Sequence, residues 1–176
     1  MIRAAVLLAA LAAAPVWPAP PNPMQLTRKA GLTPETHEFV FLHVHSHLDV
    51  FVNGKKVVVP AGIGIDIPNK AVHKFTNPQD GSTVYGGIAP ACAKPCISPL
   101  HTHADDGILH TEAKKDQFNR LGQFFTEWGR KLPAKAKVYV DGERFKGDPH
   151  AIQLKDKREI AVVVGKAPAH IPSKFP

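Results

Sequence analysis

The chain has 176 residues, of which 44% are hydrophobic and 21% are charged. This composition is ordinary for a globular protein and argues against disorder through most of the chain. The formal net charge is +7, but the lysines are scattered and form no basic run interleaved with aromatic residues, so nucleic acid is not an expected partner.

The first residues, MIRAAVLLAALAAAPVW, start with the basic Arg3 and continue in an apolar stretch from Ala4 to about Ala14. This stretch is too short to span a bilayer, so we predict a signal peptide over residues 1–19, with an uncleaved anchor as the alternative. The segment behind it, residues 20–35, is Pro-rich and is predicted to be an extended linker. The expected location is therefore periplasmic or secreted.

The stretch HVHSHLDVFVNGKKVVV, which begins at His43, predicts the first hairpin. Its even positions are almost all Val or Leu, and its odd positions carry His43, His45 and His47, which is the period-two alternation of a strand. Asn53-Gly54 is a typical type I′ turn, and KKVVVP is the return strand. The next segments, AGIGIDIPNK and NPQDGSTVYGG, read as loops with short extended pieces.

The second half of the chain begins with a second hairpin, in which ISPLHTH and ILHTEA are the strands and ADDG is the turn. NRLGQFFTEWG has helical apolar spacing, with Asn119 as its expected N-cap and Gly129 at its end. AKVYVDGERF then predicts another hairpin, and REIAVVVG predicts a final buried strand.

This order of elements predicts an α+β, mostly β fold. Residues 36–165 would form a single β-rich domain. Within it, residues 97–165 would make a β-grasp-like mixed sheet with one main helix, extended or covered by the N-terminal hairpin. Residues 166–176 would form a loose Pro-rich tail.

Cys92 and Cys96 are the two cysteines of the chain. Export favours a disulfide between them, and a three-residue spacer is feasible in a turn. A thiol pair that binds a soft metal such as Cu(I) is the alternative.

The three histidines of the opening strand set a limit on metal binding. Side chains two apart on a strand point to one face and lie about 6.5–7 Å apart, so two imidazoles can converge on one ion, whereas three span about 13 Å. We therefore expect His45 and His47, which lie closer to the turn, to lie nearer the second hairpin's histidines than His43 does.

The second hairpin carries His101 and His103 on one strand and His110 and Glu112 on the other. A two-residue turn would place His103 opposite His110, and a four-residue turn would place His101 opposite His110. In both registers the four side chains share a face, whereas a simple three-residue turn would put His110 on the other face.

Zinc and copper sites use three or four nitrogen ligands about 2.0–2.1 Å from the ion, with carboxylates that orient the rings. The sequence therefore predicts an exported protein that binds copper or zinc for metal holding, delivery or sensing. The predicted ligands are His45, His47, His101, His103 and His110, with His43, Asp49 and Glu112 as further ligands or as groups that orient the rings.

Two alternatives stay open: a redox or hydrolytic enzyme with an open metal position, and a metal-free module that contacts an envelope protein. Ser46 and Ser98 lie near histidines but outside a nucleophile-elbow context, so we assign no catalytic residue. In the metal-free case the histidines would be a polar patch bonded to backbone groups. The remaining histidines, predicted to be solvated, are His37, His73, His150 and His170.

Three blocks, HVHSHLDVFVNGK…VPAGIGI, LHTHADDGILHTEA and LGQFF, resemble a group of uncharacterised exported bacterial proteins that carry the same blocks in the same order. The resemblance covers the chain from about Val44 to Gly165 and implies an extracytoplasmic location, without implying an activity. The C-terminal half also resembles β-grasp modules, which is an analogy of fold alone.

Overall fold

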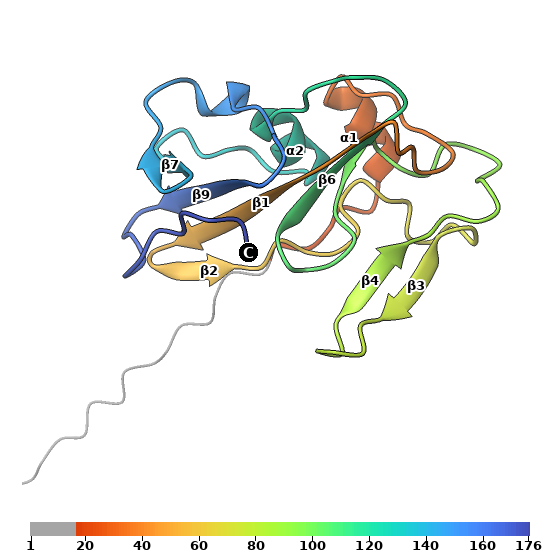
Figure 1. Ribbon diagram of the computed structural model, residues 1–176, viewed down its shortest axis with the longest axis horizontal. Coiled ribbons are helices and arrows are strands. Elements are labelled where there is room, and N and C mark those ends of the chain that lie inside the picture. The colour runs from red at the N-terminus through yellow and green to blue at the C-terminus, as the bar shows by residue number, and fades with distance from the viewer. Residues whose placement is uncertain (1–16) are drawn as a thin grey trace, which may run out of the picture.

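A mixed β-sheet forms the body of the protein, and the computed structural model describes residues 17–176. The sheet has seven strands in the order β5-β6-β1-β9-β7-β8, with β2 also paired to β1 (Figure 1). Its strands are β1 (Leu42–Val52), β2 (Lys55–Val57), β5 (Leu100–His101), β6 (Ile108–Ala113), β7 (Lys137–Val140), β8 (Glu143–Arg144) and β9 (Arg158–Val164). The remaining elements are the hairpin of β3 (His73–Thr76) and β4 (Thr83–Gly86), the helices α1 (Pro23–Lys29) and α2 (Leu121–Glu127), and a short 3-10 helix over Pro149–Ala151.

Strand β1 runs through the centre of the sheet. It pairs in parallel with β9 on one side, and on the other side it pairs antiparallel with β6 and then with β2. Its even-numbered residues Leu48 and Val50 are fully buried in the main core with Phe124 and Trp128 of α2. Its odd-numbered residues therefore point to the opposite face of the sheet, which is where the histidines lie.

The predicted fold class, α+β with a mostly β mixed sheet and one main helix, is confirmed. The apolar residues of the predicted helix are all buried, although Arg120 rather than Asn119 is the N-cap. One detail differs from the prediction for residues 97–165: the opening strand lies between β6 and β9 instead of extending or covering a sheet made by that segment. Parallel pairing of strands so distant in sequence leaves no local signal.

The prediction of an extended linker over residues 20–35 is wrong in part, because this segment contains α1. Pro23 suits the first turn of a helix, and the buried Thr27 contacts Glu127 of α2. Ahead of α1, the carbonyl of Trp17 accepts a hydrogen bond from the indole N–H of Trp128, and Ala19 also packs on the core. The predicted signal boundary at residue 19 thus falls inside a packed segment, while residues 1–16 lie outside the described part of the chain.

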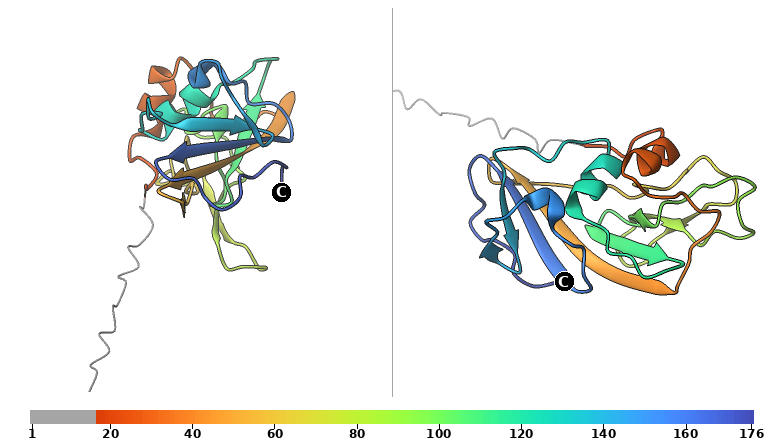
Figure 2. Two further views of the ribbon diagram at one scale, coloured as in Figure 1. Left: turned by 90° about the vertical axis from the view of Figure 1, so that its left-hand side faces the viewer. Right: turned by 90° about the horizontal axis from the view of Figure 1, so that it is seen from above.

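The C-terminal tail also packs on the molecule, contrary to the prediction that it is loose. Ile171 contacts the small apolar cluster of Phe51 and Val163 on the face of the sheet opposite α2. The views of Figure 1 and Figure 2 show the two helices on one side of the sheet and the chain end on the other. The tail therefore covers one half of the histidine-bearing face, beside the C-terminal half of β1.

In the hairpin β3–β4, β4 is one of the short extended pieces expected in NPQDGSTVYGG, whereas β3 lies just ahead of that segment, where no strand was predicted. The hairpin leaves the main sheet and projects from the body of the molecule (Figure 1). Beside it, a second small core contains Ile65, Ile97 and the disulfide between Cys92 and Cys96, which confirms the predicted bond. This core connects the hairpin to the strand that carries His101.

Candidate metal centre

The register of three adjacent strands brings the histidines together. On β1 and β6, His45 lies opposite His110 and His43 lies opposite Glu112. On β5 and β6, His101 lies opposite His110, which is the register predicted for a four-residue turn. Three imidazoles therefore form a row across β1, β6 and β5, and the prediction that the second hairpin's histidines meet is confirmed by the grouping of His101, His103 and His110.

The distances inside this cluster match those between ligands of one ion. Nε2 of His43 lies 2.9 Å from Nε2 of His45, and Nε2 of His101 lies 3.1 Å from Nε2 of His103. Oε1 of Glu112 lies 3.2 Å from Nε2 of His43 and 3.4 Å from Nδ1 of His110. Ligands placed 2.0–2.1 Å from an ion at the corners of a tetrahedron are separated by about 3.3 Å. These side chains can hold a metal ion.

Two imidazoles of the cluster are fixed by backbone carbonyls. Nδ1 of His101 donates to the carbonyl of Ser98 at 2.8 Å, and Nδ1 of His103 donates to the carbonyl of Tyr85 at 2.5 Å. Each ring thereby points its Nε2 into the cluster, where an ion could bind it. Imidazoles that bind metals in proteins are usually oriented in this way, by a hydrogen bond from the other ring nitrogen.

Gly86 makes room for His103. A Cβ atom at position 86 would lie 2.6 Å from Nδ1 of His103, and the φ of +154° is one that L side chains rarely adopt. The neighbouring Tyr85 is bonded to His103 twice, because its N–H also donates to the carbonyl of His103 at 2.9 Å. Strand β4 therefore clamps this imidazole between Tyr85 and Gly86. The sequence pattern of this segment did not indicate such a role.

The electrostatics of the cluster favour neutral rings around an anionic carboxylate. Burial lowers the pKa of His101 well below its ordinary value, and burial also lowers the pKa of His45 and of His110. Burial would lower the pKa of His103 as well, but Glu112 and the carbonyl of Tyr85 outweigh it and raise this pKa.

Glu112 itself is 6% exposed, and burial alone would raise its pKa. Its interactions with His103 and His110 outweigh burial, so the pKa of Glu112 is lowered and the carboxylate stays ionised. Metal ions bind neutral imidazoles and ionised carboxylates, so most of the cluster already holds the protonation state that binding requires.

His47 does not join this cluster, and the prediction that it lies nearer the second hairpin's histidines than His43 does is wrong. Nδ1 of His47 lies 2.6 Å from Oε2 of Glu159, and Nε2 lies 3.0 Å from the carbonyl of Asp106. Both partners are acceptors, so both bonds form together when His47 is protonated. Burial would lower the pKa of His47, but Glu159 outweighs burial and raises it.

His47, Asp49 and Glu159 also offer three atoms that could hold an ion. However, Lys56 Nζ already lies 2.6 Å from Oδ1 of Asp49, and both nitrogens of His47 are engaged. This group is therefore a buried charge network that ties the loop of Asp106 to β9. Glu159 was not among the predicted site residues, because its side chain reaches His47 only through the parallel pairing of β1 with β9.

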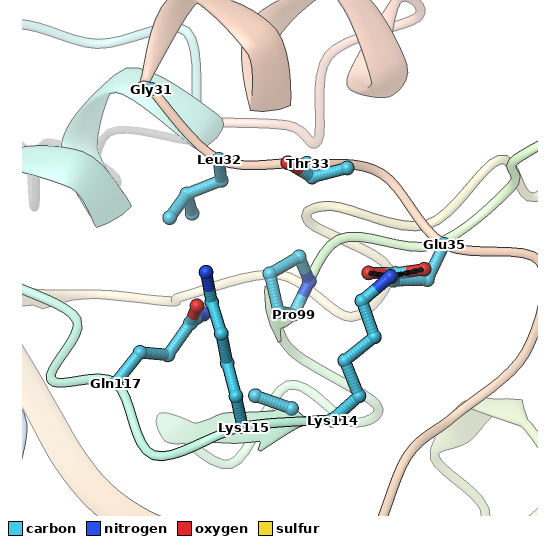
Figure 3. Close-up of a pocket in the computed structure, with 9 residues that line it drawn as sticks. Gly31, Leu32, Thr33, Glu35, Pro99, Lys114, Lys115 and Gln117 are labelled. Atoms are coloured by element: carbon cyan, nitrogen blue, oxygen red, sulfur yellow. Dashed lines mark hydrogen bonds and ion pairs between the residues drawn. The ribbon is translucent and has the colours of Figure 1, made fainter.

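A separate pocket of about 150 Å³ lies between the loop after α1 and the end of β6 (Figure 3). Its carboxylate, Glu35, is paired with Lys114 at 2.8 Å, and Lys115 stands upright in the close-up. Among the described residues that line this pocket there is no histidine or cysteine, so it adds no ligand to the cluster.

The remaining histidines lie outside the cluster. His150 and His170 are exposed, as predicted, and His37 is partly buried beside Phe39. His73 is exposed but belongs to β3 rather than to a loop.

Comparison of the chain with protein-family models, with curated proteins and with solved structures found no match. Within residues 17–176, no helix has the length and apolar character needed to cross a membrane.

Proposed function

We propose that this protein binds one divalent transition-metal ion, zinc or copper, in the cluster formed by β1, β5 and β6. The observation that carries the proposal is the pair His101 and His103. Both rings donate through Nδ1 to backbone carbonyls, so the two Nε2 atoms face each other at 3.1 Å as acceptors. When both rings are neutral, the two acceptor lone pairs repel each other at this distance, and either a proton between them or a metal ion relieves the repulsion.

The kind of ion follows from the available donor atoms. The cluster contains five imidazoles and one carboxylate, a donor set that suits zinc or Cu(II) better than magnesium or calcium, which prefer oxygen. The sulfurs of Cys92 and Cys96 are joined to each other, so they supply no thiolate for Cu(I).

Metal holding and delivery outside the cytoplasm is the role that we infer. The apolar stretch after Arg3 supports export, and the disulfide is of a kind that persists in oxidising compartments. His43 is 41% exposed, which gives a bound ion a route to solvent and to an envelope partner that takes it up or supplies it. The pattern of donors supports holding more than catalysis, because the nearby carboxylate is occupied with orienting and neutralising the cluster.

Isothermal titration calorimetry of metal-free protein with zinc and with Cu(II) at pH 7.5 tests this proposal. We expect one ion per chain for the wild type and loss of binding in the double variant His101→Ala/His103→Ala. The matched control is His150→Ala/His170→Ala, which removes the same number of imidazoles from exposed positions outside the cluster. Equal binding by the two double variants would contradict the proposed site.

A further inference from the structure

The candidate ligands divide into two overlapping sets. The outer set contains His43 and His45, and the inner set contains His101 and His103, while His110 and Glu112 belong to both. Within each set the ligand atoms lie within 4.8 Å of one another. Each set alone supplies the four ligands of a complete zinc or copper site, so an ion has two neighbouring positions available.

The shared residues lie midway between the two positions. The ring centroid of His110 is 4.4 Å from that of His45 and 4.3 Å from that of His103. Nδ1 of His110 is buried, and its partner in the cluster is Oε1 of Glu112 at 3.4 Å, which belongs to both sets as well. An ion that stays bound to His110 and Glu112 can therefore move from one set to the other without leaving the protein, by exchanging one imidazole ligand at a time.

The two sets differ in exposure and in rigidity. The side chain of His43 is 41% exposed, whereas that of His101 is 1% exposed. Both inner rings are held by backbone carbonyls, so they are already oriented for an ion. The outer set therefore meets ions from solvent, and the inner set offers the tighter position.

Charge favours one ion in the cluster over two. Repulsion grows with the product of the charges, so two divalent ions repel about four times as strongly as two single charges at the same distance. Glu112 is the one carboxylate in the two sets to offset that repulsion. The two positions are alternatives for a single ion.

We propose that the cluster is a two-position relay, in which an ion enters and leaves through His43 and His45 and is stored on His101 and His103. This relay rests on the metal binding proposed above and adds a direction to it. The outer imidazoles control the rates of loading and release, whereas the inner imidazoles control the affinity. An ion passed to a partner would leave from the exposed end of β1, where His43 lies.

Stopped-flow measurements with zinc separate these roles. Loading of metal-free protein and removal of zinc by an excess of a chromophoric chelator are followed for the wild type, His43→Ala/His45→Ala and His101→Ala/His103→Ala. For the outer variant we expect both rates to fall by about tenfold while the dissociation constant stays within about threefold. For the inner variant we expect the affinity to fall by about a hundredfold with fast exchange.

The exposed His150→Ala/His170→Ala variant serves as the control, and thermal unfolding confirms that each variant is folded. If the outer double variant does not fold, the single variant His43→Ala replaces it, because that side chain is largely solvated. Unchanged or faster rates in the outer variant, or two zinc ions bound per wild-type chain, would overturn the relay while leaving metal binding intact. A wild type that binds no zinc would instead contradict the proposed function, and the relay with it.

Discussion

Replacing Glu127 by glutamine should change how the stability of the metal-free protein depends on pH. Glu127 is fully buried, and burial raises its pKa from 4.5 to about 7 against the hydrogen bonds from Ser98 and Thr27. Oε1 lies 2.6 Å from Oγ of Ser98, and Oε2 lies 3.0 Å from Oγ1 of Thr27. The protonated acid fits this setting well, because it can donate to Thr27 while the hydroxyl of Thr27 donates to the carbonyl of Pro23.

The sign and the size of the effect on stability follow from the raised pKa of Glu127. A group whose folded pKa lies above its unfolded value gives its full stabilisation below the unfolded pKa and loses it as pH rises through the folded pKa. With values of 4.5 and about 7, the contribution of Glu127 declines from about pH 4.5 upward. A rise of this size corresponds to about 3 kcal/mol of unfolding free energy at pH 8.

Glutamine keeps the shape and the two hydrogen bonds but has no charge to bury. We therefore expect Glu127→Gln to match the wild type near pH 4.5 and to exceed it by about 3 kcal/mol at pH 8. Urea unfolding in the presence of a chelator, at pH 4.5 and at pH 8, measures this difference directly. Parallel pH dependences for the two proteins would refute the argument that Glu127 is buried as a neutral acid.

The remaining predictions concern the histidine cluster and its neighbours. Zinc or Cu(II) at a hundredfold excess over its dissociation constant should add about 2.7 kcal/mol to stability at pH 7.5, and a chelator should remove this gain. The gain should shrink at pH 5 because protons compete for the imidazoles, first at His103, whose pKa is raised; melting curves at both pH values test this. His47→Gln should lower stability by about 3 kcal/mol, because Glu159 loses its buried partner, while zinc binding in a titration stays close to that of the wild type. Gly86→Ala should weaken zinc binding by about tenfold, because the added methyl group displaces His103, and unchanged affinity would contradict the clamp by β4.

The sequence predicted those features that depend on local patterns. Alternation along residues 42–52 indicated β1 and the face on which its histidines lie, and the turn residues indicated the three hairpins. Helical spacing of Leu121, Phe124 and Trp128 indicated the buried face of α2. Part of the row of His45, His110 and His101 could be predicted. The length of the turn in the second hairpin decides whether His101 lies opposite His110.

Features that depend on contacts between distant segments could not be predicted. Parallel pairing of β1 with β9 places Glu159 beside His47, so that a predicted ligand is instead engaged in a buried hydrogen bond. His43 enters the cluster because β6 places Glu112 directly opposite it. The clamp on His103 comes from Tyr85, a residue in a segment that has no strand periodicity long enough to be recognised.

X-ray absorption spectroscopy of zinc-loaded protein at pH 7.5 shows whether the histidine cluster holds the ion, because it reports the ligands of the ion themselves. The geometry predicts a shell of nitrogen and oxygen atoms at about 2.0–2.1 Å, with outer-shell scattering from at least two imidazole rings and no sulfur. This signature should be lost in the His101→Ala/His103→Ala variant and kept in the His150→Ala/His170→Ala variant. A shell of water oxygens without imidazole scattering, or zinc that dialysis removes completely from the wild type, would contradict the assignment of the cluster as a metal centre.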